Sequence, residues 1–201
     1  GEQLEGGRKG GGHGGPVLVI RPEGAAQIAL IGPPNAGKSA LHARLTGSGA
    51  LVAPYPFTTQ VPQPGMLPHE DIHFQLIDLP PVAPEHPVPW LGSTLQTADA
   101  ALLVADLREP ACLEQLQAVR SILAGRRVTL TEHWAAAGGD RPAAEDVFSI
   151  RLPTLLLANK ADLVADPAAE LQTLRELSGL PFPTLAVSAE TGLGLGGLGP
   201  W

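Results

Sequence analysis

Cysteine, methionine and aromatic side chains are scarce in this chain of 201 residues, which holds one cysteine, one methionine and 4% aromatics. The lone cysteine, Cys112, excludes an internal disulfide and is typical of a reducing compartment. The longest apolar runs, such as 100–105, are far shorter than the ~20 residues that span a bilayer. We therefore expect a soluble, cytoplasmic domain with no leader peptide and no membrane partner.

Basic side chains are outnumbered by acidic ones, since 13 Lys and Arg stand against 20 Asp and Glu and leave a net charge of −7. Nucleic-acid binding draws mostly on Lys and Arg, so this composition argues against a DNA-binding protein. Any contact with nucleic acid, RNA included, is expected to come from regions outside this chain. The 44% of hydrophobic residues are enough for one domain with a real core.

Three regions differ in composition. The glycine-rich residues 1–16 are expected to form a flexible linker, and Gly1 in place of methionine suggests a fragment or a processed chain. Strand and helix patterns alternate over 17–192, which predicts a mainly parallel six-stranded α/β sheet with helices on both faces. An insertion at 124–151 interrupts this alternation. The glycine-rich tail 193–201 ends where a closing helix is expected, so we expect a truncated C-terminus.

Short apolar runs and helical leucine spacing place the individual elements. Five prolines between 80 and 89 exclude regular structure there. Asp99 and Asp106, which flank a predicted strand, are expected to be solvated. Strands are expected at Gln27–Ile31, 73–78, 101–106, 154–158 and 184–187, with an extra pair at 127–132 and 146–151, and helices at 39–45, 111–123 and 167–177.

A phosphate-loop pattern, GPPNAGKS at 32–39, lies between a predicted strand and a predicted helix. In such a loop the backbone N–H groups turn toward the phosphates and the helix dipole adds to the attraction. Lys38 would reach the β- and γ-phosphates, and Ser39 would ligate Mg²⁺. The alternative is an ordinary glycine-rich turn. The predicted phosphate-binding residues are Gly32, Pro33, Pro34, Asn35, Ala36, Gly37, Lys38, Ser39 and Ala40.

A second motif, NKAD at 159–162, follows a predicted apolar strand. The Asp162 carboxylate can accept hydrogen bonds from N1–H and the exocyclic amine of guanine, whereas adenine has neither donor at that edge. Lys160 would pack along the base, and Asn159 would brace the phosphate loop. The combination favours GTP over ATP and leaves an ATP-using kinase or ATPase as a rival. Backbone N–H groups for guanine O6 are expected from Ser188, Ala189 and Glu190.

The order and spacing of these motifs resemble the Ras-like G domains of translation-associated P-loop GTPases, and more narrowly the Obg/DRG group. The segment RPEGAAQIALIG at 21–32 looks like the DRG branch, whose members carry a TGS domain. The resemblance covers roughly 17–192, the G domain only, and YPFTT is its most diagnostic part. The residues that carry it are GPPNAGKS at 32–39, YPFTT at 55–59, DLP at 78–80, NKAD at 159–162 and SAE at 188–190.

By that resemblance the chain binds GTP and GDP, hydrolyses GTP and acts in ribosome- or RNA-linked work. The resemblance implies Mg²⁺ ligation by Ser39, by Thr59 and, through water, by Asp78, with Lys38 and Thr59 as catalytic residues. Phe57 and Thr58 would lie at the nucleotide, and Thr58 is the alternative Mg²⁺ ligand. Asn35 would help to hold K⁺, which can take the place of an arginine finger; its alternative role is that of a plain turn residue.

The chain departs from this family pattern at the second switch, which reads D-x-x-G in the family and presents a glycine N–H to the γ-phosphate. The fourth position here is Pro81, which has no N–H. Val82 follows, where some GTPases carry a catalytic glutamine, and His86 is a candidate by proximity alone. We expect guanine and Mg²⁺ binding with slow hydrolysis, stimulated by K⁺. The alternatives are a non-catalytic guanine-nucleotide switch or scaffold and, less favoured, the G domain of a membrane transporter.

Overall fold

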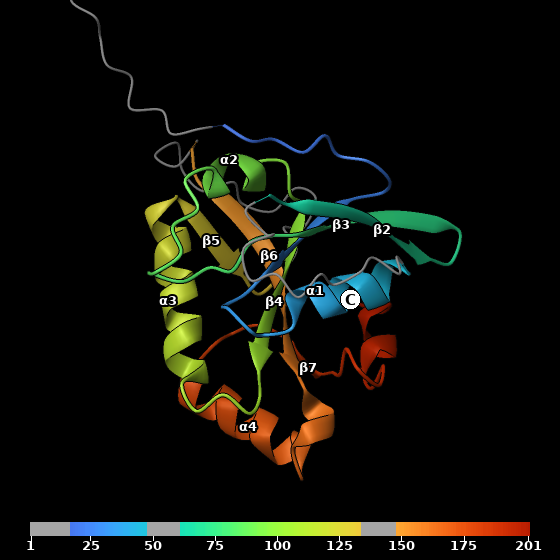
Figure 1. The fold of residues 1–201 in the computed structure, drawn as a ribbon, viewed down its shortest axis with the longest axis vertical. Coiled ribbons are helices and arrows are strands. Elements are labelled where there is room, and N and C mark those ends of the chain that lie inside the picture. Colours follow the sequence, from blue (N-terminus) through green and yellow to red (C-terminus); the bar gives the residue numbers. More distant parts are fainter. Residues whose placement is uncertain (1–16, 48–60, 134–147) are drawn as a thin grey trace, which may run out of the picture.

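The computed structural model describes residues 17–47, 61–133 and 148–201, and Figure 1 shows how its elements are arranged. They form a seven-stranded sheet in the order β2-β3-β1-β4-β6-β5, with β7 pairing with β6. Only β2 runs antiparallel to its neighbour among these pairs, so the expected mainly parallel sheet is confirmed with seven strands in place of six. The strands are β1 (Gln27–Ile31), β2 (Gln63–His69), β3 (Ile72–Asp78), β4 (Ala100–Asp106), β5 (Val128–Thr131), β6 (Ile150–Asn159) and β7 (Thr184–Ala186).

Helices cover both faces of the sheet because the side chains of each strand alternate between two cores. Ala101 and Leu103 of β4 join the core under α2, α3 and α4, whereas Leu102 and Val104 join the core under α1. The three expected helices are confirmed with small changes at their ends, and α2 is a short addition that the sequence did not indicate. The helices are α1 (Lys38–Thr46), α2 (Leu91–Leu95), α3 (Cys112–Gly125) and α4 (Pro167–Ser178).

The sequence did not predict the strand β2, because Pro64 and Pro68 interrupt its apolar pattern. It lies at the edge of the sheet, where proline is tolerated because one side of the strand needs no partner. A turn at Glu70, which has a left-handed φ of 51°, joins it to β3, and the two strands pair antiparallel along their whole length. This hairpin supplies the seventh strand.

The insertion before β6 also differs from the expectation. β5 lies within the expected 127–132, but the second strand expected at 146–151 is wrong as a separate element, because Ile150 already belongs to β6. Pro153 interrupts the apolar run and so suggested two strands. In the structure, β6 continues through it: its first part pairs with β5 and the rest pairs with β4.

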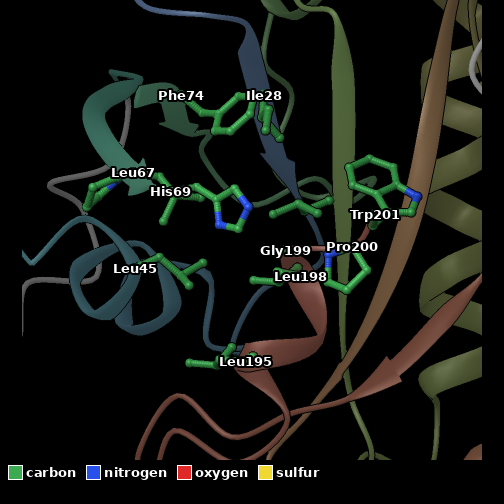
Figure 2. Close-up of a pocket in the computed structure, with 13 residues that line it drawn as sticks. Ile28, Leu45, Leu67, His69, Phe74, Leu195, Leu198, Gly199, Pro200 and Trp201 are labelled. Atoms are coloured by element: carbon green, nitrogen blue, oxygen red, sulfur yellow. The ribbon is translucent and has the colours of Figure 1, made fainter. Parts of the chain in front are cut away.

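The glycine-rich end of the chain packs on the same face of the sheet as α1. A short 3-10 helix, Leu195–Leu198, forms there, and both of its leucines contact the core. A largely apolar cavity of about 430 Å³ lies between this segment, Leu45 of α1 and the β2–β3 hairpin. Figure 2 shows His69 on one wall of it and Trp201 on another. The tail therefore covers only part of this face.

Candidate functional site

The phosphate-loop residues join β1 to α1 through two left-handed backbone positions. Asn35 has a φ of 61°, and Gly37, which precedes the first turn of α1, has a φ of 90°. Asparagine and glycine adopt this conformation with the least strain, so the residue order suits the turn. A Cβ on Gly32 would lie 2.7 Å from the carbonyl oxygen of Val104 on β4. The free N–H groups at the start of α1 make this turn suited to an anion.

Ser39 and Asp78 meet where β3 ends. The Ser39 hydroxyl donates to Asp78 Oδ2 at 2.7 Å, while Asp78 Oδ1 is buried without a partner in the described parts of the chain. Burial raises the pKa of Asp78 and lowers the pKa of Lys38, which is also buried, and the attraction between the two charges opposes both shifts. A buried, unpartnered carboxylate oxygen beside a hydroxyl suits a hard, partly hydrated cation. These residues therefore fit Mg²⁺.

Val82 anchors the segment after β3 to the phosphate loop. Its N–H donates to the Gly32 carbonyl at 2.9 Å, and its side chain is 2% exposed within the core. A valine buried in this way offers no side chain that could orient a water molecule. His86 is exposed and closes a small turn through an N–H···O bond to Ala83 at 3.0 Å. As its prolines predict, 80–89 forms no helix or strand.

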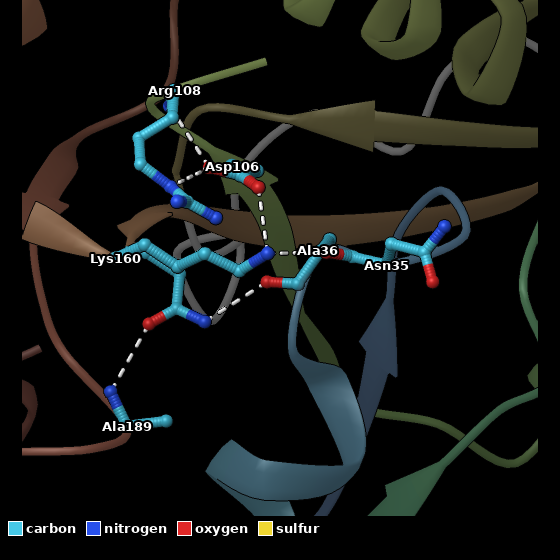
Figure 3. A network of polar contacts seen from close by, with 7 residues as sticks. Asn35, Ala36, Asp106, Arg108, Lys160 and Ala189 are labelled. Atoms are coloured by element: carbon cyan, nitrogen blue, oxygen red, sulfur yellow. Dashed lines mark hydrogen bonds and ion pairs between the residues drawn. The ribbon is translucent and has the colours of Figure 1, made fainter. Parts of the chain in front are cut away.

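Asn159, at the end of β6, connects the phosphate loop to the loop that holds Ser188, Ala189 and Glu190 (the SAE loop); Figure 3 shows its partners Ala36 and Ala189. Its Nδ2 donates to the Ala36 carbonyl at 2.9 Å, and its Oδ1 accepts the N–H of Ala189 at 3.1 Å. Asn159 is 1% exposed, and both the nitrogen and the oxygen of its side-chain amide are hydrogen-bonded within the protein. The phosphate loop and the SAE loop are thereby linked through one side chain.

Asp106, at the end of β4, is 9% exposed, so the expectation that it is solvated is wrong. Its Oδ2 accepts from Lys160 Nζ at 2.6 Å, and the backbone N–H of Arg108 donates to its Oδ1 at 2.8 Å. Asp99, at the other end of the strand, is exposed and accepts the N–H of Gln27 at 2.8 Å. The parallel pairing of β4 with β6 puts Asp106 beside Asn159, and the burial of Asp106 follows from that register.

A cavity of about 350 Å³ opens beside the NKAD residues, at the carboxyl ends of β6 and β7. Asp162 and Glu190, whose side chains are exposed, line this cavity. Arg44 of α1, which the sequence analysis did not single out, donates to the carbonyls of Ala189 at 3.2 Å and Glu190 at 3.0 Å and so supports the SAE loop. The cavity is lined by Gly37, Ala40, Arg108, Asn159, Lys160, Asp162, Leu163, Ser188, Ala189 and Glu190.

The described motif residues gather at one edge of the sheet, which is where parallel α/β sheets bind ligands. Three of the predicted site residues, Phe57, Thr58 and Thr59, lie outside the described residues. The roles assigned to the others stay predictions. Those at the shared edge are Gly32, Pro33, Pro34, Asn35, Ala36, Gly37, Lys38, Ser39, Ala40, Asp78, Asn159, Lys160, Asp162, Ser188, Ala189 and Glu190.

Comparison with known sequences identifies GTPase relatives. A family model described as 50S ribosome-binding GTPase matches residues 27–132. The GTPase Obg of Moorella thermoacetica is 31% identical over 186 residues, which cover 89% of this chain and 39% of that protein. The developmentally-regulated GTP-binding protein 2 homolog of Dictyostelium discoideum is 40% identical over 72 residues, or 36% of this chain and 20% of that protein. The chain thus spans well under half the length of these relatives.

Solved structures share the fold. A crystal structure of an SsGBP mutation variant superposes with a TM-score of 0.59 at 21% identity, covering 87% of this chain and 52% of that one. The G domain of the T. maritima FeoB iron transporter superposes with a TM-score of 0.53 at 24% identity, covering 86% and 93%. Both likenesses support the P-loop G-domain fold. Within the described ranges, none of the helices has the length and apolar character needed to cross a membrane.

Proposed function

The chain belongs to the family of 50S ribosome-binding GTPases, and from this premise we propose that it is a G domain that binds GTP and GDP and hydrolyses GTP slowly. The observation that carries the proposal is the hydrogen bond from Asn159 of NKAD to Ala36 of the phosphate loop. This bond joins the NKAD motif to the phosphate loop at one edge of the sheet, so that one nucleotide could contact both.

Guanine recognition is assigned to Asp162. Its carboxylate is exposed at the cavity beside Lys160 and can accept from both N–H donors on the guanine edge. Adenine would leave those oxygens without a donor, which is the kind of mismatch that gives high selectivity. Ala189 and Glu190 also line this cavity. Because the Ala189 N–H already donates to Asn159 Oδ1, the N–H assigned to guanine O6 is that of Glu190.

Phosphate and metal binding are assigned to the first turn of α1 and the end of β3. Lys38 would contact the β- and γ-phosphates and offset the charge that develops on the transferred group. Mg²⁺ would be held by Ser39 and, through water, by Asp78, with Thr59 as a further ligand by family resemblance; when bound, it neutralises phosphate charge. Asn35, at the tip of the loop, is the proposed K⁺ ligand.

Slow hydrolysis is proposed because the second switch lacks two expected groups. Pro81 has no N–H to offer the γ-phosphate, and Val82, at the position where some GTPases carry a glutamine, is buried. Neither change falls on a residue assigned to guanine or to Mg²⁺. A non-catalytic guanine-nucleotide switch is the second candidate, and Pro81 is the observation that favours it.

Ribosome association and a cytoplasmic location are proposed from the family alone. Acidic residues outnumber basic ones, and the whole chain has a net charge of −7. Contacts with a ribosome would then come from regions that the longer relatives have outside the matched part.

Single-turnover GTP hydrolysis with Mg²⁺, measured in KCl and again in NaCl, tests this proposal. Binding of a fluorescent guanine nucleotide is measured in the same samples, with competition by ATP. We expect guanine-specific binding and a slow rate that is higher in K⁺, and Asn35→Ala should remove the difference between the salts. Tight binding without turnover in either salt would support the non-catalytic switch. Equal competition by ATP would rule out the assigned role of Asp162.

A further inference from the structure

We propose that Asp106 is a positioning residue for nucleotide binding, which holds Lys160 against the phosphate loop and so aims the loop's N–H groups. The inference rests on the proposed binding of guanine nucleotides. It goes beyond that function because Asp106 belongs neither to the phosphate-loop pattern nor to NKAD.

The carboxylate of Asp106 is fixed from its own strand. Asp106 pairs with Asn159 in the parallel register of β4 and β6, and the next N–H, that of Leu107, donates to the Asn159 carbonyl at 3.1 Å. The N–H of Arg108 then occupies Oδ1 at 2.8 Å. With one oxygen held by the backbone, Oδ2 is directed at Lys160 Nζ, 2.6 Å away.

Lys160 needs such a partner because its backbone and side chain are both constrained. It has a φ of 63°, an unusual conformation for lysine that persists only where the surroundings hold it. The Lys160 side chain is 25% exposed and that of Asp106 is 12% exposed, so the pair is shielded from much of the solvent. Without the carboxylate, the ammonium group would be free to turn toward water and leave the carbonyl of Asn35, to which it donates at 2.8 Å (Figure 3).

The carbonyl of Asn35 matters because a trans peptide points its C=O and its N–H in opposite directions. The described residues contain no cis peptide. The hydrogen bond from Lys160 Nζ fixes the Asn35 carbonyl so that it points toward the end of β6. The N–H of Ala36, in the same peptide group, must then point away from β6. The hydrogen bond from Asn159 Nδ2 fixes the Ala36 carbonyl in the same way, and so fixes the direction of the Gly37 N–H. Two consecutive N–H groups of the phosphate loop are thus aimed by two consecutive residues of NKAD.

A double-mutant cycle with Asp106→Asn and Lys160→Met tests the link, with fluorescent GDP as the probe. Asp106→Asn removes the charge and keeps the shape, and Lys160→Met removes Nζ and keeps the stem. We expect Asp106→Asn to raise the Kd about tenfold, mainly through faster dissociation, as loss of a charge-assisted hydrogen bond predicts. The double variant should bind no more weakly than Lys160→Met alone. Asp99→Asn, at the exposed end of the same strand, is the matched control and should leave the Kd unchanged.

Hydrogen exchange of the amides at 35–37 in nucleotide-free protein gives a second readout that needs no ligand. Asp106→Asn should speed this exchange, and Asp99→Asn should not. An unchanged or lower Kd for Asp106→Asn, fully additive effects in the cycle, or unchanged exchange would overturn the positioning role. Failure of the wild-type chain to bind GDP would overturn the proposed function instead, and the exchange measurement would still decide whether Asp106 orders the loop.

Discussion

The base half and the metal half of the candidate site are built differently. In the base half, Asn159 is hydrogen-bonded at both ends of its amide, and Lys160 donates to a carboxylate and a carbonyl. In the metal half, one buried oxygen of Asp78 has no partner among the described residues, and Lys38 is a buried charge. Pro81 adds no donor there. Among the described residues the base half is therefore preorganised, whereas the metal half keeps groups that a bound ligand would satisfy.

Because of this difference, nucleotide affinity and the rate of GTP hydrolysis should depend on different halves of the site. A preorganised base half loses little conformational entropy when a nucleotide arrives, so affinity depends mainly on groups that are already in place. Hydrolysis depends on charge compensation and water positioning around the γ-phosphate. Pro81 and the buried Val82 supply neither a donor that compensates charge nor a side chain that positions water. Substitutions in the two halves should consequently affect different measurements.

Gly37→Ala should have the largest effect, because Gly37 lies where the two halves join. The added Cβ would meet Asn159 Nδ2 at a left-handed position with a φ of 90°. We expect the affinity for both GDP and GTP to fall more than about 100-fold, since the clash displaces the amide that connects the halves. Titration with fluorescent GDP and GTP measures the loss.

Gly47→Ala is the matched control for that substitution. Gly47 ends α1 with a φ of 63°, but a Cβ there would meet no described residue within 4 Å. The control should lower the free energy of unfolding by about 1 kcal/mol through backbone strain alone and leave the nucleotide affinity unchanged. Equal losses of affinity in the two variants would mean that backbone strain, and not contact with Asn159, is responsible.

Asp162→Ala should affect the base half alone. Loss of the two hydrogen bonds to guanine is expected to weaken GDP binding about 100-fold while the weak binding of ADP stays the same. Competition titrations with GDP and ADP measure both values. Mg²⁺ dependence of the residual binding should be unchanged, because Ser39 and Asp78 are untouched. A parallel loss of ADP affinity would show that Asp162 supports the fold of the loop and does not select the base.

Local patterns predicted much of the fold and the motif residues, and pairing between distant segments explains what they missed. The turn at Gly37 follows from the glycine itself, and the apolar runs marked the central strands. β2 stayed hidden because Pro64 and Pro68 are acceptable only at a sheet edge, and an edge is a property of the whole sheet. Asp106 was misjudged for a similar reason: its burial depends on the register between β4 and β6. No pattern within either strand reports that register.

Pro81→Gly should affect the metal half alone. It returns an N–H to the position where the family pattern has one, so we expect the single-turnover rate of GTP hydrolysis to rise about tenfold, the usual size of one added hydrogen bond to the transferred group. The affinity for GDP should change less than twofold. An unchanged rate would indicate that Val82, pinned to Gly32, keeps this segment away from the γ-phosphate even when the N–H is present.

Asp78→Asn should have the smallest effect, on stability without nucleotide and metal. Burial raises the pKa of Asp78 above its ordinary value of 3.8, so the folded state binds this proton more tightly than the unfolded chain does. The free energy of unfolding therefore falls as pH rises from 3.8 through the raised pKa, and asparagine avoids that loss. We expect the variant to be more stable than wild type at pH 7 and to lose this advantage near pH 4.

Urea unfolding of both chains at the two pH values measures this difference. Addition of GDP and Mg²⁺ at pH 7 should reverse the order, because the bound cation compensates the wild-type carboxylate and stabilises only the chain that binds it. A wild-type chain that is already the more stable one without ligands would mean that Lys38 alone compensates Asp78. The metal half would then be as preorganised as the base half, and the contrast between them would not hold.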